Sequence, residues 1–365
     1  MDFEPTEERR LLAETLARFL AAEYSIEHRN SVAYSEPFHD PVKWRALADL
    51  GVLHALAAPA DGGMGGAGFD IATVFETLGA ALCPEPFLGA LLSVRLLAAA
   101  GCDLAPLLSG QIRYAAAVGE TDAPYDPAEI GCEAHRGRNG WVLHGRKSVV
   151  YGGASAERLV IAARADGGAL ALWEVAASDA RISGYGMIDG GNAAEVFLDG
   201  TPAAMILPEA GAALQDALDH GALALCAEAV GAMDTAQAML LDYLQTRRQF
   251  GRPIGSFQAL QHRMVDLTIE IEQARSITIL AAGNMGTDRQ TRTVSMAKNL
   301  VGRMAKLVAE ELIQMHGGIA MTWEYPASHF AKRLVMIDHQ LGDTDFHLHR
   351  VMAEHMRPGN GPSSG

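Results

Sequence analysis

The stretch at residues 243–261, YLQTRRQFGRPIGSFQALQ, decides how the whole sequence is interpreted. One helix ends in Arg247 and Arg248, a tight Gly-Arg-Pro-Ile-Gly turn follows, and Ser256 is a good N-cap for a new helix. Arginine at a helix end beside a free helix N-terminus can hold a diphosphate, and Gln258 can add an amide contact. Alternatively, the arginines cap the first helix and meet acidic neighbours. The segment by itself leaves both interpretations open.

Outward from this stretch, the chain divides into three blocks of different periodicity. Apolar side chains recur at helical spacing in the first and last blocks, whereas the middle block holds short β-prone runs separated by turn residues. We therefore predict an N-terminal α-helical domain at 1–110, a small antiparallel β domain at 111–203 and a C-terminal four-helix bundle at 204–356. This mainly α order with a central β domain argues against a doubly wound sheet.

Long helices are expected in the last block, at 212–246, 256–283, 289–317 and 327–340. A shorter helix is expected in the first block, where Asp40 is a plausible N-cap and Pro41 suits the first helical turn.

Composition and charge exclude several classes of function. The 365 residues carry a formal net charge of −15, so nucleic acid and anionic membrane surfaces are not expected as partners. No CxxC spacing links Cys83, Cys102, Cys132 and Cys226, so we expect no metal site and no disulfide framework. No apolar run is typical of a signal peptide or a membrane span, which makes a cytoplasmic location the default. Residues 357–365 are predicted to form a flexible tail.

A glycine-rich stretch at 63–68, GMGGAG, matches the GxGxxG pattern of dinucleotide-binding proteins. That fingerprint requires a preceding strand and a βαβ unit, because its glycines form the turn between strand and helix. Here a helical segment and an Ala-Pro-Ala-Asp turn precede the glycines, and no βαβ unit follows. We therefore interpret 63–68 as a structural loop.

Two segments in the last third resemble signatures of the acyl-CoA dehydrogenase family. Residues 247–261 are similar to its R-x-x-F-G-x-P-(I/L)-x-x-F-Q-x-x-Q motif. Residues 314–326, QMHGGIAMTWEYP, are similar to Q-x-x-G-G-x-G-x-x-x-E-Y-P, with Ala320 in place of the third glycine. Looser similarity covers 59–79 and 145–164, so the resemblance spans nearly the whole chain. It also accounts for the order of helices, β unit and helices.

The resemblance implies an FAD cofactor bound at a subunit interface. The residues that would contact the cofactor are Arg247, Gln249, Phe250 and Gln258. The residues that would hold its pyrophosphate and adenosine part from a neighbouring subunit are Gln314, Met315, His316, Gly317 and Gly318. The two glycines fit such a role because they lack a Cβ where backbone must approach a phosphate closely. Alternatively, Gly-Gly is a turn that ends a helix.

The family's catalytic base is missing from both of its usual positions. Dehydrogenation needs a carboxylate that takes the α proton while the flavin accepts a hydride from the β carbon. By the resemblance, Gly342 and Gly221 occupy the two positions where family members carry a glutamate. Asp343 is therefore the catalytic residue that we predict, with an N-cap of the helix starting near Asp345 as the alternative. The other groups weighed are Glu228, His339, His347 and His349, for which structural roles are more common.

The segments that would face the flavin also depart from the family pattern. Residues 119–124, GETDAP, are shorter than the family's T-E-P-x-x-G-S and lack its serine. Val149 and Tyr151 stand where the family has a tryptophan and a threonine beside the flavin.

Three hypotheses for the function follow from these observations. The first is an FAD-dependent acyl-CoA dehydrogenase of fatty acid or steroid catabolism that acts on a bulky or unusual acyl group, as a homo-oligomer. The second is the base-lacking partner in a bacterial heterotetramer with a related dehydrogenase subunit. The third is a binding protein that keeps the scaffold without dehydrogenating. The resemblance implies an acyl-CoA substrate and an electron-transferring flavoprotein as electron acceptor.

Overall fold

The computed structural model describes residues 6–138, 140–166 and 168–356, so the predicted tail at 357–365 lies outside the described residues. Contacts between Cα atoms divide the chain into two compact units. The first, the helical unit, comprises Met1–Glu27, Ala72–Cys83 and Ala222–Gly365. The second, the sheet unit, comprises His28–Ile71 and Pro84–Gly221.

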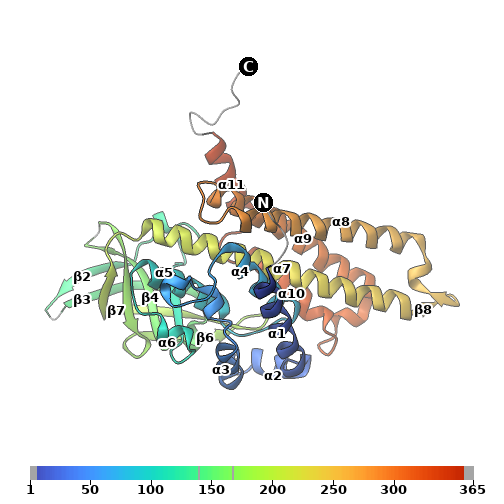
Figure 1. The fold of residues 1–365 in the computed structure, drawn as a ribbon, viewed down its shortest axis with the longest axis horizontal. Coiled ribbons are helices and arrows are strands. Elements are labelled where there is room, and N and C mark those ends of the chain that lie inside the picture. The colour runs from blue at the N-terminus through green and yellow to red at the C-terminus, as the bar shows by residue number, and fades with distance from the viewer. Residues whose placement is uncertain (1–5, 139, 167, 357–365) are drawn as a thin grey trace, which may run out of the picture. The chain divides into compact units, whose positions relative to one another are not determined.

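Long helices build the helical unit (Figure 1). They are α1 (Glu7–Glu23), most of α4 (Gly68–Ala80) and of α7 (Gly211–Thr246), α8 (Gln258–Gly283), α9 (Gln290–His316), α10 (Ala327–Asp338) and α11 (Thr344–His355). Helix α9 packs against α8, α10 and α11. Its buried apolar side chains recur every three or four residues, at Val294, Ala297, Val301, Ala305, Val308 and Leu312. This stripe places α9 in the core of the unit.

The four long helices predicted from the sequence are confirmed, with ends shifted by at most two residues. One local prediction is wrong, because Ser256 does not cap α8. A short 3₁₀ turn, Ile254–Ser256, precedes the helix, and the N-cap position falls on Phe257 without a side-chain bond. The Ser256 hydroxyl instead donates to the carbonyl oxygen of Pro253 at 2.7 Å.

Close contact between two helix backbones joins α4 to α7 inside the helical unit. A Cβ at Gly79 would lie 2.0 Å from the carbonyl oxygen of Glu228, and one at Gly231 would lie 1.9 Å from that of Glu76. No side chain fits at such a distance, so both positions require glycine. The Thr235 hydroxyl adds a 3.0 Å hydrogen bond to the Ala80 carbonyl across the same contact.

The sheet unit combines helices with a seven-stranded sheet. The helices are α2 (Ile26–Ala33, mostly in this unit), α3 (Pro41–Asp49), α5 (Phe87–Ala99) and α6 (Ala105–Leu108). The strands are β1 (Tyr114–Ala117), β2 (Glu133–Gly137), β3 (Gly140–Tyr151), β4 (Arg158–Ala165), β5 (Leu170–Ala176), β6 (Arg181–Gly186) and β7 (Asn192–Leu207). Trp173 is fully buried in this unit and donates its indole N–H to the Ala163 carbonyl at 3.2 Å.

The predicted order of helices, sheet and helices is confirmed, but the sheet is mixed rather than wholly antiparallel. Strand β4 pairs in parallel with β1 and with β2, and the other strand pairs are antiparallel. Since β4 also pairs with β5, the strands β4, β2, β3, β7 and β5 form a closed ring of pairings. Strand spacing could not reveal this, because parallel pairs depend on which distant strands become neighbours.

Contacts also group the chain differently from the three predicted sequence blocks. Residues 72–83, inside the predicted N-terminal domain, belong to the helical unit together with the C-terminal helices.

The predicted structural loop at 63–68 packs closely against the preceding backbone. A Cβ at Gly63 would lie 2.0 Å from the Ala57 carbonyl oxygen, and one at Gly65 would lie 2.6 Å from that of Ala55. Helix α4 rather than a strand adjoins this loop, which supports the structural interpretation.

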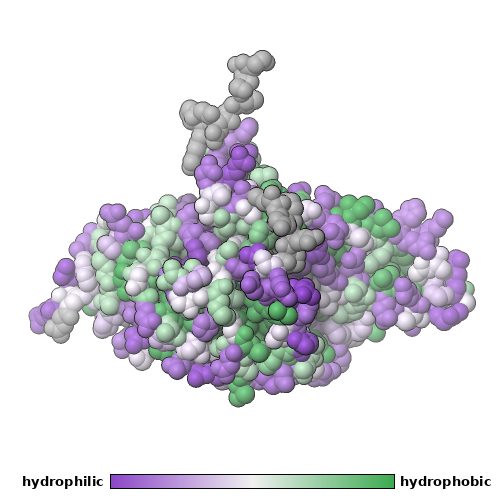
Figure 2. Space-filling view, in the orientation of Figure 1, coloured by the Kyte–Doolittle hydropathy of each residue, from purple (hydrophilic) through white to green (hydrophobic). Residues whose placement is uncertain are grey.

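None of the described helices is long and apolar enough to cross a bilayer. On the face shown in Figure 2, polar surface predominates, with hydrophobic surface over part of α8. The exposed apolar residues of that helix are Val265, Ile269 and Leu280.

Replacement of Gly231 by alanine tests the contact between α4 and α7. The added methyl group would overlap the Glu76 carbonyl, so the helices must separate, and we expect a loss of about 1–3 kcal/mol in the free energy of unfolding. Gly211→Ala, at the start of the same helix, is the control, because its Cβ would meet no atom within 4 Å. Urea denaturation measures both variants, and equal midpoints would refute the packing argument.

Candidate functional site

The C-terminal end of α7 presents the first predicted cofactor-binding motif. Strands β8 (Arg248–Gln249) and β9 (Arg252–Pro253) form a hairpin beyond this end. Phe250, at the tip of the hairpin, has a φ of 52° and is 90% exposed. The side chains of Arg247, Gln249 and Gln258 are also exposed. The motif therefore extends polar and aromatic groups into solvent.

The end of α9 lies beside this motif in the same chain. The His316 ring stands between two tyrosines, 4.7 Å from the Tyr243 ring and 5.2 Å from the Tyr325 ring. Tyr243 lies in the last turn of α7, four residues before Arg247, so the two predicted motifs meet at the Tyr243–His316 contact. Arg247 closes that turn by donating its backbone N–H to the Tyr243 carbonyl at 2.8 Å.

Burial separates the predicted residues of this second motif into two groups. Gln314, Gly317 and Gly318 are exposed, whereas Met315 and His316 are only 5% and 3% exposed. The His316 Nδ1–H donates to the Leu312 carbonyl at 2.8 Å, and Nε2 is buried with no hydrogen-bond partner among the described residues. Burial lowers the pKa of His316, so the ring is neutral and Nε2 is an available acceptor.

The residues at this end of the helical unit fit a phosphate-bearing group. The side chains of Arg247, Gln249, Gln258 and Gln314 form no hydrogen bond to another described residue. A Cβ at Gly317 or Gly318 would meet no atom within 4 Å, and Gly317 has a φ of 70°. An open glycine turn beside a guanidinium that is not paired within the described chain suits close approach of a diphosphate.

Beyond α10, the turn at 338–344 is where the resemblance places one of the two family glutamates. Leu341 has a φ of 55° and Gly342 a φ of 103°, so the chain reverses sharply here. The fully buried Lys298 ammonium donates to three carbonyl oxygens, those of Ile337, Asp338 and Gly342, at 2.8, 3.0 and 2.8 Å. Burial lowers the pKa of Lys298 to about 8. His347 also donates Nε2–H to the Leu341 carbonyl at 3.1 Å.

A side chain at Gly342 would require the rings of Phe346 and His347 to move. A Cβ there would lie 2.5 Å from Cδ1 of Phe346 and 2.6 Å from Nε2 of His347. The left-handed backbone adds strain for any residue other than glycine. A glutamate at this position would therefore strain the turn and displace both rings. The second position, Gly221, is buried in α7.

The carboxylate of Asp343, the predicted catalytic residue, caps α11. Its Oδ1 accepts the backbone N–H of Phe346 at 2.8 Å. This contact matches the alternative interpretation of Asp343, although the helix begins at Thr344, one residue earlier than expected. The catalytic role of Asp343 stays a prediction.

The carboxylate of Glu228 is held by a buried guanidinium. Nε and Nη2 of Arg333 donate to its two oxygens at 2.6 and 2.7 Å, and Nη1 donates to the Gln340 amide oxygen at 2.9 Å. All three residues are buried: Glu228 is 7% exposed, Arg333 is 8% exposed and Gln340 is 2% exposed. Because breaking a buried pair leaves an uncompensated charge, Glu228 is committed to Arg333 and is a poor general base.

The three histidines named from the sequence differ in environment. His339 and His349 are exposed, whereas His347 is 1% exposed, and burial followed by the charges of Lys298 and Arg350 lowers its pKa to about 3. A permanently neutral His347 that already donates to Leu341 serves the turn rather than proton transfer.

Several site residues were missed by the sequence analysis. Tyr243 and Tyr325 were quoted inside the motifs, but nothing in their spacing showed that they enclose His316. Lys298 is a lysine inside the apolar pattern of α9, and that position was a usable signal of a buried charge. Glu195 of β7, which bonds to Ser148 and Val149, gave no signal because strand register decides the contact.

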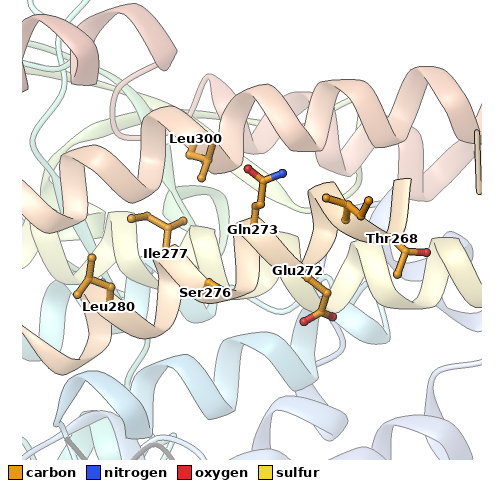
Figure 3. Close-up of a pocket in the computed structure, with 8 residues that line it drawn as sticks. Thr268, Glu272, Gln273, Ser276, Ile277, Leu280 and Leu300 are labelled. Atoms are coloured by element: carbon orange, nitrogen blue, oxygen red, sulfur yellow. The ribbon is translucent and has the colours of Figure 1, made fainter. Parts of the chain in front are cut away.

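The helical unit also has a groove between α8 and α9 that none of the predicted site residues lines (Figure 3). It encloses about 600 Å³ and is lined by Thr268, Ile269, Glu272, Gln273, Ser276, Ile277 and Leu280 of α8 and by Leu300 of α9. Within the described ranges, no cluster of three or more His, Cys, Asp or Glu side chains could hold a metal ion.

Comparison with known proteins decides the family. The acyl-CoA dehydrogenase N-terminal domain matches residues 6–102, and the acyl-CoA dehydrogenase C-terminal domain matches residues 211–356. The chain belongs to the acyl-CoA dehydrogenase family. It is 32% identical over 354 residues to acyl-CoA dehydrogenase IpdE2 of Mycolicibacterium smegmatis, covering 96% of this chain and 99% of that protein. Homologues of this family are oxidoreductases that act on CH–CH bonds.

Two solved structures extend the comparison to the fold of the whole chain. A variant of the Tcur3481-Tcur3483 steroid ACAD superimposes with a TM-score of 0.86 at 29% identity, covering 95% of this chain and 98% of that one. The ChsE4-ChsE5 complex from Mycobacterium tuberculosis superimposes with a TM-score of 0.85 at 25% identity, covering 97% and 98%. These similarities confirm the predicted acyl-CoA dehydrogenase fold.

His347 is expected to make this protein less stable in mild acid. Its pKa is about 3 in the folded state but 6.5 ordinarily, so between these values only the unfolded state binds the proton. The free energy of unfolding therefore falls as pH drops below 6.5, by about 2 kcal/mol at pH 5. In His347→Gln, which keeps an N–H donor, this contribution disappears.

Urea titrations at pH 7 and pH 5 measure the difference. His349→Gln is the control, because His349 is an exposed residue of the same helix and should leave the pH dependence unchanged. Identical pH dependence in His347→Gln and the unmodified protein would contradict a neutral buried His347.

Proposed function

We propose that this chain is the base-lacking subunit of an FAD-dependent acyl-CoA dehydrogenase that assembles with a related subunit carrying the base. The observation that carries this proposal is that both carboxylates weighed as the base, Asp343 and Glu228, already hold other groups. Asp343 caps α11, and Glu228 is held in two hydrogen bonds by Arg333. Gly342 carries no carboxylate, and a side chain there would displace Phe346 and His347. A free carboxylate is needed for the α proton, so another chain supplies it.

Similarity to assemblies of two different chains supports the same proposal. The ChsE4-ChsE5 complex and the Tcur3481-Tcur3483 structure are both named for two components. The second is named a steroid ACAD, which supports a bulky, steroid-like acyl-CoA as the substrate here. By family resemblance, an electron-transferring flavoprotein accepts the electrons, and the cytoplasm is the location.

The residues proposed to hold FAD lie at the ends of α7 and α9 that meet within one chain, so both motifs would contact the same FAD, bound at a subunit interface. Arg247 supplies a charged, forked donor for the pyrophosphate, and Gln249, Gln258 and Gln314 supply amides. The turn at Gly317 and Gly318 admits a phosphate close to backbone N–H groups. Phe250 offers an exposed aromatic face, whereas Met315 and His316 are buried at the end of α9 that carries the turn. Bound FAD would supply the hydride acceptor.

Expression of this chain alone, and together with a related acyl-CoA dehydrogenase chain that carries a glutamate at one of the two base positions, tests the proposal. We expect the purified complex to be yellow, with a flavin spectrum that bleaches under a bulky acyl-CoA thioester. We expect this chain alone to show no turnover with an artificial electron acceptor. Absence of flavin from both preparations would instead favour a scaffold that only binds a ligand.

Asp343→Asn tests the alternative in which this chain provides its own base. Asparagine is also a good N-cap, so the fold should be kept, and we expect turnover of the complex to change less than twofold. Asp345→Asn, which alters an exposed carboxylate in the first turn of the same helix, is the matched control. A loss of about 100-fold or more in Asp343→Asn alone would make Asp343 the base, since general base catalysis contributes that much.

A further inference from the structure

Val149 in the sheet unit holds a strained backbone on the surface. Its φ is 49°, and among the described non-glycine residues with positive φ it is the one with a β-branched side chain. Such a conformation costs about 1–3 kcal/mol and persists only where the surroundings enforce it. Val149 is 44% exposed, so burial of its side chain offsets little of this strain.

An interruption in the pairing of β3 with β7 produces this conformation. Lys147 pairs with Val196, and the next pair is Val150 with Ala194. Ser148 and Val149 are therefore left over as a bulge opposite Glu195. We call these two residues the Ser148–Val149 bulge.

The carboxylate of Glu195 binds the bulge from the β7 side. Oε2 accepts the Ser148 hydroxyl at 2.6 Å and Arg146 Nε at 2.9 Å. Oε1 accepts the Val149 backbone N–H at 3.3 Å and the Tyr185 hydroxyl at 3.3 Å. One carboxylate therefore holds four donors from two strands.

Charge adds to this arrangement. Partial burial opposes ionisation of Glu195, but the hydrogen bonds from Ser148, the Val149 N–H and Arg146 outweigh it and lower its pKa. Burial and the adjacent Glu195 raise the pKa of Tyr185 to about 12, so this hydroxyl remains a donor. At neutral pH, the group that binds the bulge is a carboxylate.

A second set of bonds fixes the bulge from the opposite side. Ser148 donates its N–H to the Gly119 carbonyl at 2.9 Å, and its hydroxyl lies 3.0 Å from that of Thr121. The buried Lys147 donates to the Val118 carbonyl at 3.0 Å and to Glu120 at 2.6 Å. The bulge is thus bonded to residues within 119–124. By the family resemblance, this segment would also face the flavin, and it too departs from the family pattern.

We propose that Glu195 is a positioning residue of the flavin site, which holds the Ser148–Val149 bulge so that Val149 is presented to the flavin ring. This inference rests on the proposed function and on the family pattern, in which Val149 replaces a tryptophan beside the flavin. Without Glu195, no side chain of β7 would hold the strained backbone of Val149 through a hydrogen bond. The bulge then relaxes, and the apolar side chain leaves its place.

Glu195→Gln in the complex of this chain with its related subunit tests the role of the carboxylate. The glutamine amide has the same shape as the carboxylate, but one of its two oxygens becomes an NH₂ group. That group cannot accept the hydrogen bonds that the oxygen accepted. We expect the dissociation constant for FAD to rise about tenfold. We also expect the visible absorption maximum of the bound flavin to shift in wavelength. Glu174→Gln on β5 is the matched control, because Glu174 accepts the Tyr114 hydroxyl at 3.0 Å and faces Arg158 without touching a bulge. Flavin affinity should be unchanged in the control.

Val149→Gly shows whether Glu195 acts through strain. Glycine adopts positive φ freely, so the bulge should keep its conformation without help from the carboxylate. The loss of FAD affinity caused by Glu195→Gln should therefore be at least about threefold smaller in the Val149→Gly background. Purely additive effects would overturn the strain argument, since coupled residues give non-additive changes.

The outcomes separate this inference from the proposed function. No flavin in the unmodified complex refutes the proposed function. Flavin in the unmodified complex with equal affinity and an equal spectrum in Glu195→Gln refutes only the inference. If Glu195→Gln does not fold, Ser148→Ala removes the shortest bond to Glu195, and it should weaken FAD binding in the same direction. Unchanged affinity in Ser148→Ala would then refute the inference.

Discussion

The contact between the backbones of α4 and α7 is the constraint on which the helical unit depends. Because Gly79 and Gly231 have no side chains, each helix approaches a carbonyl oxygen of the other as closely as a backbone allows. This contact fixes the axis and rotation of α7. Its middle then directs Glu228 to Arg333, and its C-terminal end places Tyr243 against His316.

Polar groups in the helical unit are used in two opposite ways. Near the turn between α10 and α11, the buried cationic side chains are hydrogen-bonded, Lys298 to three carbonyl oxygens and Arg333 to Glu228 and Gln340. Buried charges are tolerated only when they are paired in this manner. At the facing ends of α7 and α9, in contrast, Arg247 and three amides are exposed and make no bond to described residues. The first region is built to be rigid, and the second is open to an anionic ligand.

Three of the six described non-glycine residues with positive φ lie at positions that the sequence had singled out. Phe250 lies in the arginine motif, Leu341 in the turn expected to carry the base, and Val149 at the position of the family tryptophan, and each has positive φ. Strain of this kind is kept where neighbouring bonds enforce one conformation. His347 bonds to the Leu341 carbonyl, and Lys298 bonds to the carbonyl of the adjacent Gly342. Glu195 bonds to Val149, so both strained residues have an identifiable restraint.

Helices and motifs could be predicted from the sequence because they depend on residues close together in the chain. The apolar stripe of α9 lies within the single helix expected at 289–317, and Asp40 with Pro41 starts α3 as predicted. The predicted cap at Ser256 is wrong because a 3₁₀ turn precedes the helix. The prediction of a wholly antiparallel sheet is wrong because β4 pairs in parallel with β1 and β2. Neither outcome could be read from residue type alone, since each depends on which of several competing backbone contacts forms.

The sequence by itself determined the family, the long helices and the absence of glutamate at Gly342 and Gly221, since these are properties of residue type and spacing. Only the tertiary structure decided which charges are paired. In the sequence, Glu228 cannot be told from an unpaired acid, and the structure shows that Arg333 of α10 binds it. Glu195 cannot be told from other strand residues, and the structure shows that it binds the bulge of β3 opposite it. The physical reason is that a carboxylate's chemistry depends on the donors around it, and folding brings those donors from distant parts of the chain.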